Sequence, residues 1–165
     1  MKKILIFLII IFNLVSCDTN ENKISNQEIN YDDYLIELNE IYNIEKDQYA
    51  VYFSSAYCPA CNSLVEHLNN FLLLENKCFD NFYIVDITNT NQDDFNKMKS
   101  GNAMFDEDII SSSLNATSLQ ETYFKTAPCI YVFNKIENVN KLTDLLLNYQ
   151  DVYDVFTLNI YAKED

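Results

Sequence analysis

The stretch Ala50-Val-Tyr-Phe-Ser-Ser-Ala-Tyr-Cys-Pro-Ala-Cys61 holds the residues that decide the fold of this chain. It begins within Tyr49 to Phe53, a short apolar run that fits a buried strand better than a helix of that length. Cys58 and Cys61 follow after a short loop. Apolar residues then recur at helical spacing, and Pro59 stands where a first helical turn tolerates a missing N–H. The pattern therefore predicts a strand, a loop and a helix that begins at the two cysteines.

Two later segments extend this prediction. Residues Phe82 to Ile87 read as a second buried strand, so strand, helix and strand form a βαβ unit with a parallel strand pair. Cys129 to Phe133 reads as a third strand, entered directly from Ala127-Pro128. The chain of 165 residues is long enough for one core but not for two, so we expect one α/β domain.

A pair of cysteines with two residues between them is typical of a redox dithiol, of half a zinc site, or of two unrelated core thiols. Here the predicted helix start places the sulfur of Cys58 against unpaired N–H groups and the positive end of the helix dipole, which favours the thiolate. Cys61 lies about one turn further along the predicted helix. Its thiol can hydrogen-bond the first sulfur and then attack a mixed disulfide formed there, which favours the redox interpretation.

The segment from Ala50 to Cys61 resembles the first core strand and active-site loop of the thioredoxin-like family, and Thr126-Ala127-Pro128 matches that family's cis-proline beside the dithiol. The two motifs span residues 49 to 134. The resemblance implies a three-layer α/β/α fold with a central mixed sheet, an N-terminal helix and a partly helical insertion before the cis-Pro strand.

The resemblance also implies a reaction. Cys58 is the nucleophile that attacks a client disulfide, and Cys61 is the resolving thiol; run backwards, the reaction oxidises, and the Pro-Ala dipeptide between the cysteines leaves the direction open. No metal is implied, and no cofactor other than the redox-active Cys58–Cys61 disulfide. The residues implied to support the site or bind substrate are Tyr57, Pro59, Ala60, Ala127 and Pro128.

This chain departs from the family's pattern in three places. Tyr52 stands where thioredoxins have a buried Asp, so proton transfer from Cys61 lacks an obvious base. Asn62 stands where a Lys often follows the motif, and the insertion, at about residues 88 to 117, is longer than in a minimal thioredoxin. These departures indicate a specialised member.

The remaining thiols and the single histidine have weaker claims to a role. Cys129 follows Pro128 directly, and core packing is favoured over a third redox thiol or a metal ligand. Cys78, at the end of the predicted helix, is too far from Cys58 to pair with it and is interpreted as structural. His67 is out of phase with Cys61 on that helix and is expected at the surface or at the edge of a groove.

The N-terminus resembles a bacterial lipoprotein signal peptide. Lys2 and Lys3 precede an apolar run too short to span a bilayer comfortably, and Leu14-Val15-Ser16-Cys17 resembles a lipobox. We therefore expect a signal peptide over 1–16, lipidation at Cys17, a flexible tether over 17–30, and the thioredoxin-like domain over 31–165. This organisation predicts an extracytoplasmic protein of the bacterial cell envelope, anchored to a membrane through Cys17.

The net charge and the implied fold indicate which partners to expect. The formal net charge of −14 argues against nucleic acid. The expected partners are client proteins with disulfides or thiols, a redox partner at the membrane or outside the cytoplasm, and the bilayer itself. Two alternatives stay open: a metallochaperone that holds a soft ion such as Cu(I) on the dithiol, and a surface binding protein in which the dithiol only staples the loop.

The other elements are less sharply defined. Apolar residues at three- and four-residue steps from Tyr34 to Tyr42 predict an N-terminal amphipathic helix, and residues 118–121 have the spacing of a capping box at a short helix. Leu142, Leu145 and Leu146 suit a helix. Phe156 to Ile160 fits either a strand or a helix.

Overall fold

A four-stranded sheet in the order β2-β1-β3-β4 forms the centre of the computed structural model, which describes residues 29–99, 107–124 and 126–161. Strand β1 (Gln48–Ser54) runs parallel to β2 (Phe82–Asp86) and antiparallel to β3 (Cys129–Ile136). Strand β4 (Val139–Leu146) pairs antiparallel with β3. The predicted parallel βαβ pair and the mixed sheet are therefore confirmed.

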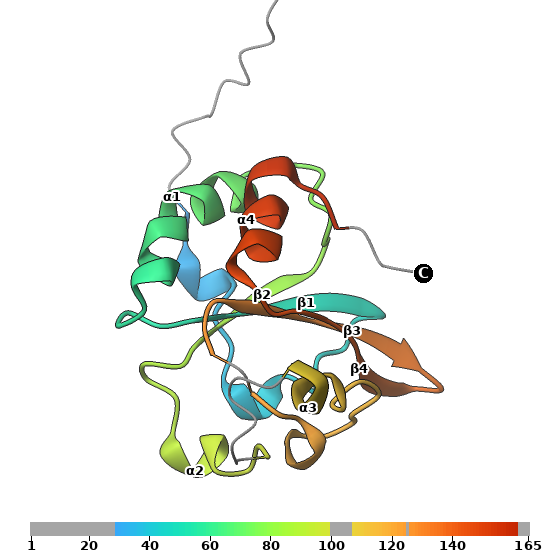
Figure 1. Cartoon of the computed structure of the whole chain (residues 1–165). Coiled ribbons are helices and arrows are strands. Elements are labelled where there is room, and N and C mark those ends of the chain that lie inside the picture. Colours follow the sequence, from blue (N-terminus) through green and yellow to red (C-terminus); the bar gives the residue numbers. More distant parts are fainter. Residues whose placement is uncertain (1–28, 100–106, 125, 162–165) are drawn as a thin grey trace, which may run out of the picture.

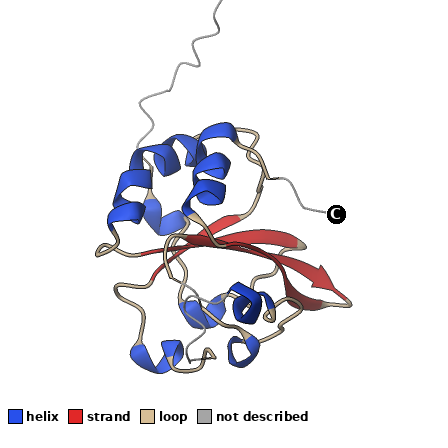
Figure 2. Cartoon of the chain, in the orientation of Figure 1, coloured by secondary structure: helices blue, strands red, loops and turns tan. Residues whose placement is uncertain are grey.

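Helices cover both faces of this sheet (Figure 1). On one face lie α1 (Pro59–Leu72) and α4 (Tyr149–Leu158), which pack against each other. On the other lie the short helices α2 (Gln92–Phe95) and α3 (Glu107–Ser111) together with loops (Figure 2). This arrangement is the predicted thioredoxin-like three-layer α/β/α fold, with one layer built largely from short elements.

Strand β1 supplies side chains to both core regions because successive residues point to opposite faces of the sheet. Ala50 and Tyr52 belong to the apolar cluster under α1 and α4, where the Tyr52 ring meets the edge of Phe156 at 5.1 Å. Val51 and Phe53 belong to the cluster on the opposite face. The residues of β1 that contact α1 are thus fixed by the pleat of the strand.

The predicted N-terminal helix is wrong. The segment forms two short 3-10 helices, η1 (Tyr31–Asp33) and η2 (Leu38–Glu40), and between them it pairs with the edge of β2. There the Ile84 N–H donates to the carbonyl of Tyr34 at 2.8 Å, and the Ile36 N–H donates to the carbonyl of Ile84 at 3.0 Å. These bonds satisfy edge groups that a continuous helix would leave unpaired.

The helix suggested by Leu142, Leu145 and Leu146 is also wrong, because all three residues lie within strand β4. A two-residue turn at Glu137 and Asn138, both with positive φ (54° and 63°), reverses the chain between β3 and β4. The helix instead begins at Tyr149 and runs through Phe156 to Leu158, which resolves the ambiguous last segment in favour of a helix.

The insertion before β3 is partly helical, as predicted, through α2 and α3; its residues 100–106 lie outside the described part. It pairs with the free edge of β4, where Asn115 N–H donates to Leu142 O at 2.7 Å and Leu142 N–H donates to Ala116 O at 2.9 Å. The short helix after Ser118 forms as η4 (Leu119–Glu121), but without the predicted capping box. The Glu121 carboxylate accepts from the Thr117 N–H instead, at 2.7 Å.

The predicted signal peptide, Cys17 and all but the end of the tether lie outside the described residues, so these boundaries stay predictions. Within the described part, no helix has the length and apolar character needed to cross a membrane.

Candidate active site

Cys58 lies where the carboxyl end of β1 passes into α1. It is the N-cap of that helix, with an extended backbone, and its Sγ accepts a hydrogen bond from the backbone N–H of Cys61 at 3.1 Å. Pro59 occupies the first turn of the helix, where no N–H is required. The helix therefore begins at the dithiol, as the sequence predicted, and an orphan N–H of its first turn points at the sulfur of Cys58.

Hydroxyl groups hold the loop that carries Cys58. The Thr88 Oγ1 accepts from the Ala56 N–H at 2.8 Å and donates to the Ser55 Oγ at 3.2 Å. The Cys58 N–H in turn donates to the Ser55 carbonyl at 3.1 Å. Sequence reasoning missed Thr88. Its position two residues after β2 was the available signal, because the carboxyl ends of parallel strands meet at one edge of a sheet.

Asn62 also supports this loop. Its side-chain Nδ2 donates to the carbonyl of Ala56 at 3.2 Å. Asn62 therefore ties the first turn of α1 back to the loop in front of it.

The structure brings Ala127 and Pro128 to the dithiol across a wide separation in sequence. The Ala127–Pro128 peptide bond is cis. The Sγ of Cys58 donates a hydrogen bond to the carbonyl oxygen of Ala127 at 3.3 Å. The sulfur of Cys58 therefore lies between the first turn of α1 and the residue that precedes the cis-proline, as the resemblance implied.

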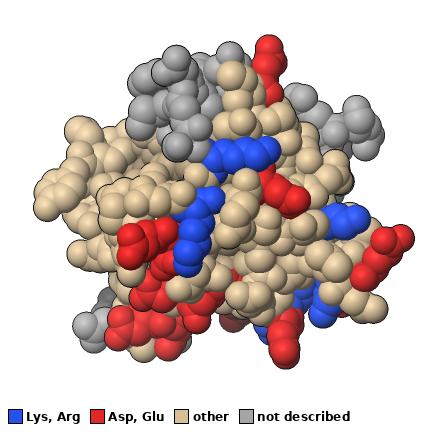
Figure 3. Space-filling model, turned by 90° about the horizontal axis from the view of Figure 1, so that it is seen from below, with Lys and Arg blue, Asp and Glu red and all other residues tan. Residues whose placement is uncertain are grey.

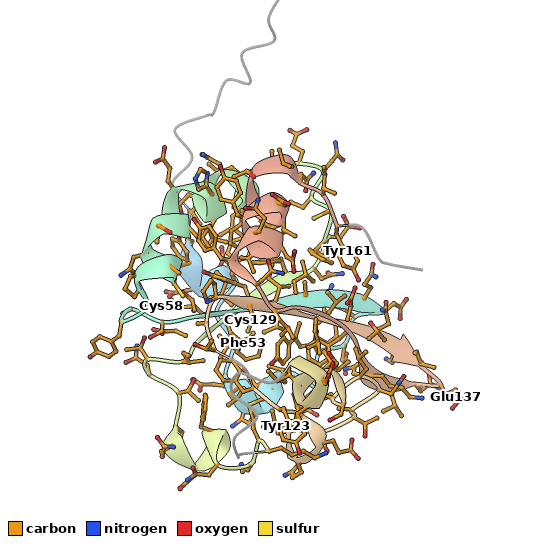
Figure 4. All side chains as sticks on the ribbon, viewed as in Figure 1. Phe53, Cys58, Tyr123, Cys129, Glu137 and Tyr161 are labelled. Carbon is orange, nitrogen blue, oxygen red and sulfur yellow. The ribbon has the colours of Figure 1, made fainter. Side chains whose placement is uncertain are left out.

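The two thiols of the pair differ in exposure. Both are free; Cys58 is half-buried at the edge of the molecule (Figure 4), whereas Cys61 is only 2% exposed. Tyr57, directly before the nucleophile position, is 86% exposed, and Pro59 is exposed as well. A second protein can therefore reach Cys58 across Tyr57 and Pro59, but it cannot reach Cys61 directly.

Burial is the largest of the effects that together raise the pKa of the Cys61 thiol to about 11, and the neighbouring Cys58 acts in the same direction. Ser55 and Tyr52 act in the opposite direction and lower this pKa. Cys61 is therefore held as a neutral thiol behind Cys58 at neutral pH.

Tyr52, on β1, stands where the resemblance implied a buried Asp, and it is itself buried. Burial raises the pKa of Tyr52 well above its usual range, so the position holds a neutral phenol. The sequence showed only that an acid is missing.

Cys129 is fully buried in the apolar cluster on the face of the sheet opposite α1. It pairs in register with Phe53, and both belong to the cluster between the sheet and the short helices. Cys61 instead belongs to the buried face of α1. This placement agrees with the core-packing interpretation of Cys129.

Cys78 and His67 lie apart from the dithiol. Helix α1 ends at Leu72, earlier than predicted, and half-buried Cys78 lies in the loop that follows, with its N–H bonded to the Asn159 Oδ1 at 2.7 Å. The half-buried His67 ring meets the edge of Tyr153 at 5.1 Å. Among the described residues, no group of three or more His, Cys, Asp or Glu side chains is arranged to hold a metal ion.

The sheet order, the helix that starts at a Cys-x-x-Cys pair and the cis-proline beside it define a thioredoxin-like fold with a dithiol site. No protein-family model and no curated protein matches the chain. Among solved structures, it is similar to a thioredoxin of Plasmodium falciparum with 18% sequence identity, over 74% of this chain and 84% of that chain, at a TM-score of 0.39.

Proposed function

We propose that this protein is a thiol-disulfide oxidoreductase that exchanges disulfides with client proteins through Cys58 and Cys61. One observation carries the proposal. The sulfur of Cys58 is accessible, accepts the Cys61 N–H at 3.1 Å, and lies 3.3 Å from the carbonyl of Ala127, with a second thiol buried directly behind it. A sulfur in this setting can be attacked from outside by a client and from inside by Cys61.

The reaction uses only these two residues. The Cys58 thiolate attacks one sulfur of a client disulfide; the client S–S bond breaks, one client thiolate leaves, and a Cys58–client mixed disulfide forms. The sulfur of Cys61 then attacks the Cys58 Sγ, which forms the Cys58–Cys61 disulfide and releases the second client sulfur as a thiol. Two electrons pass from the dithiol to the client. The reverse sequence oxidises a client dithiol, and no further cofactor takes part.

The proposed supporting residues have separate tasks. Exposed Tyr57 and Pro59, with Ala60, form the surface next to Cys58 on which a client segment rests. The backbone before Pro128 offers the Ala127 carbonyl, which a bound client can use once Cys58 has reacted. Tyr57→Ala is expected to weaken client capture without changing the reactivity of Cys58 toward a small disulfide.

The proposed setting is the bacterial cell envelope, outside the cytoplasm, with attachment to a membrane through acylated Cys17. Acidic side chains outnumber lysines over the face seen in Figure 3, and the formal net charge is −14. Such a surface repels anionic lipid headgroups and nucleic acid, so attachment depends on acyl chains. Cys17→Ser is expected to move the protein from the membrane to the soluble fraction and to abolish labelling with radioactive palmitate.

A trapping experiment tests the enzymatic proposal. In Cys61→Ser the mixed disulfide cannot be resolved, so client conjugates that are sensitive to dithiothreitol should accumulate through Cys58. The control is the double variant Cys58→Ser, Cys61→Ser, which keeps Cys78 and Cys129 and should trap nothing. A folded Cys61→Ser protein that forms no conjugates beyond this control would overturn the proposal.

The direction of exchange follows from a redox equilibrium with glutathione. Cleavage after Lys46 and Lys77 releases one tryptic peptide, residues 47–77, that contains Cys58 and Cys61 and no other cysteine. The fraction of this peptide in the disulfide form, measured by mass spectrometry over a series of glutathione ratios, gives the reduction potential. A value near that of thioredoxin, about −270 mV, assigns a reductase, and one near −120 mV assigns an oxidase.

A further inference from the structure

Strands β1 and β2 end at the same level, and this places Thr88 beside the loop that leads to Cys58. Ser54 pairs in register with Asp86, and the Ile87 N–H donates to the Ser54 carbonyl at 2.9 Å. Parallel strands point the same way, so the chain leaves both strands at one edge of the sheet. Thr88 is the next residue after this pairing, and it therefore lies opposite the start of the loop.

The turn after β2 holds Thr88 in a fixed position. The Thr88 N–H donates to the Asp86 Oδ1 at 2.9 Å, and the Asn89 side chain donates to the Asp86 Oδ2 at 2.9 Å. An aspartate that bonds to the backbone two residues on forms an Asx-turn, which fixes the backbone locally. The half-buried Thr88 side chain is β-branched, so it also has few rotamers. A rigid turn therefore presents the Thr88 hydroxyl to the loop.

The Thr88 hydroxyl makes two hydrogen bonds with the loop. Its Oγ1 accepts from the Ala56 N–H at 2.8 Å and donates to the Ser55 Oγ at 3.2 Å. Ser55 in turn accepts the next two N–H groups: that of Tyr57 at its Oγ, at 3.2 Å, and that of Cys58 at its carbonyl, at 3.1 Å. We call the hydroxyls of Ser55 and Thr88 the hydroxyl clasp. Three consecutive N–H groups are thus bonded to Thr88 directly or to the residue that Thr88 holds.

Packing contributes little to the conformation of this loop, because the side chains of Ala56 and Tyr57 are exposed. The loop nevertheless sets the position of Cys58, whose Sγ lies 3.1 Å from the Cys61 nitrogen and 3.3 Å from the Ala127 carbonyl oxygen. A loop with few buried contacts keeps one conformation mainly through its hydrogen bonds. The hydroxyl clasp therefore fixes, together with helix α1, where the sulfur of Cys58 lies relative to Cys61.

We propose that Thr88 is a positioning residue for the resolving step: by holding the loop in front of Cys58, it keeps the Cys58 sulfur within reach of Cys61. Thr88 acts through Ala56 and Ser55 and not on a reacting atom. A reaction between two groups held in place depends steeply on position, and a displacement of about 1 Å can cost on the order of 100-fold in rate. The inference rests on the proposed oxidoreductase function.

The resolving step itself uses only the two cysteines and the client. The Cys61 sulfur gives up its proton and attacks the Cys58 Sγ of the mixed disulfide; the Cys58–Cys61 bond forms and the bond from Cys58 to the client breaks. The client sulfur leaves with the electron pair of that bond and takes up a proton in place of the one that Cys61 lost. Thr88 exchanges no proton and no electron, so its contribution is to geometry alone.

The test follows a mixed disulfide with glutathione in the full chain. Reduced protein is mixed with glutathione disulfide, quenched with acid at set times, alkylated and digested with trypsin. The peptide of residues 47–77 then reports the glutathione adduct and the internal disulfide separately from the other cysteines. Position 88 lies outside this peptide, so the wild type and the variants at that position yield the same reporter.

The variant is Thr88→Val, which keeps the shape of the side chain and removes only its hydroxyl. The matched control is Thr90→Val. The Thr90 Oγ1 donates to the Asp86 carbonyl at 3.1 Å, so the control loses a hydrogen bond within the same turn but keeps both bonds of Thr88 to the loop. A third variant, Thr88→Ser, keeps the hydroxyl and tests for rescue.

The expected results differ between the two steps of the reaction. Thr88→Val should form the adduct at close to the wild-type rate, because attack on a dissolved disulfide needs no fixed position relative to Cys61. It should resolve the adduct about tenfold more slowly, because the two sulfurs are then held less closely in place. Thr88→Ser should restore resolution, and Thr90→Val should resemble the wild type in both steps.

The outcomes distinguish this inference from the function on which it rests. A wild type that forms the adduct but never converts it to the internal disulfide overturns the proposed function and this inference with it. If the wild type resolves the adduct and Thr88→Val matches it, or if Thr90→Val slows resolution equally, the role of Thr88 alone is overturned. If Thr88→Val fails to fold, Ser55→Ala replaces it: loss of the other hydroxyl of the clasp should also slow resolution, and an unchanged rate overturns the inference.

Discussion

At the scale of single residues, the fold gives two cysteines of the same chemistry opposite surroundings. Cys58 is half-buried at a helix start with an N–H and a carbonyl at its sulfur, whereas Cys61 is enclosed and its pKa is raised to about 11. A thiol with such a pKa does not react with a passing disulfide near neutral pH, because the thiolate is the reactive form. Placement next to the Cys58 sulfur makes Cys61 effective only in the intramolecular step.

Cys129 follows the cis-proline directly, and its environment predicts that it takes no part in exchange. Cys129→Ala should lower the free energy of unfolding by about 1 kcal/mol, because it removes a buried sulfur from the core. The rate at which Cys58 and Cys61 form their disulfide with glutathione should not change. Urea denaturation and the peptide of residues 47–77 measure the two quantities. A slower exchange in a variant of unchanged stability would instead make Cys129 part of the site.

At the scale of elements, the sequence predicted those segments whose apolar pattern is the simple one of a regular element. Strands β1, β2 and β3 are short apolar runs that bury side chains on both faces of the sheet, and helix α1 has one apolar face. The N-terminal segment has no such pattern: Tyr31 and Tyr34 pack on the α1 side, whereas Leu38 and Ile41 pack on the opposite face. Its apolar residues are spaced three and four positions apart because the segment passes around the edge of the sheet and packs on both faces. A local sequence pattern does not reveal such a path.

The apolar residues of strand β4 have a helical spacing because its pairing with β3 is irregular. Val132 pairs with Asp144 but Phe133 pairs with Leu142, so the register skips one residue of β4. Leu142 and Leu145 consequently pack on the same face at a helical spacing, and Leu146 packs on the other. The bulge is a property of the pairing with β3 and leaves no separate signal in the sequence.

The candidate site also contains residues that the sequence predicted and residues that it did not. Its cysteines and the Ala127–Pro128 bond were predictable because each belongs to a recognisable local motif. The hydrogen bonds of Thr88 with Ala56 and Ser55 depend on where different elements meet, so they required the structure. The catalytic roles themselves stay predictions until the trapping experiment is done.

The turn between β3 and β4 contains a residue, Glu137, whose backbone conformation lowers stability. Glu137 has a φ of 54°, a left-handed conformation that costs an ordinary L-residue about 1 kcal/mol and that Asn tolerates better. Glu137 lies at the tip of the hairpin (Figure 4), so Glu137→Asn should raise the free energy of unfolding by about 0.5 to 1 kcal/mol in urea denaturation. Glu137→Gln removes the same charge without the backbone benefit and should leave stability unchanged. Equal stabilisation by both variants would assign the effect to charge.

At the scale of the whole molecule, one sheet separates two cores of different construction. The face under α1 and α4 is covered by two regular helices that pack together, and it carries the dithiol and Tyr52. The other face is covered by short helices and loops, and it holds Cys129. The reactive thiols therefore rest on the more regular half, which suits a site whose hydrogen bonds require fixed positions.

Buried thiol and phenol groups on both faces of the sheet predict how the stability of the protein depends on pH. In the folded protein the pKa values of the Cys61 and Cys78 thiols are raised to about 11, against an ordinary value of 9.0, and that of Tyr42 is raised to about 12. Above pH 9 the unfolded chain therefore loses protons that the folded chain keeps. Because the unfolded state then binds fewer protons, stability falls as pH rises.

The contribution of the two thiols should thus be fully present below pH 9 and be lost as pH rises to about 11, with Tyr42 extending the decline. Urea denaturation of the reduced protein across this range measures the slope. The oxidised protein, in which Cys61 no longer titrates, should show a shallower decline, and Cys78→Ser in the oxidised form a shallower one still. A free energy of unfolding that stays level from pH 9 to pH 11 would show that these thiols titrate alike in the folded and unfolded chains, and the enclosed setting assigned to Cys61 would then be wrong.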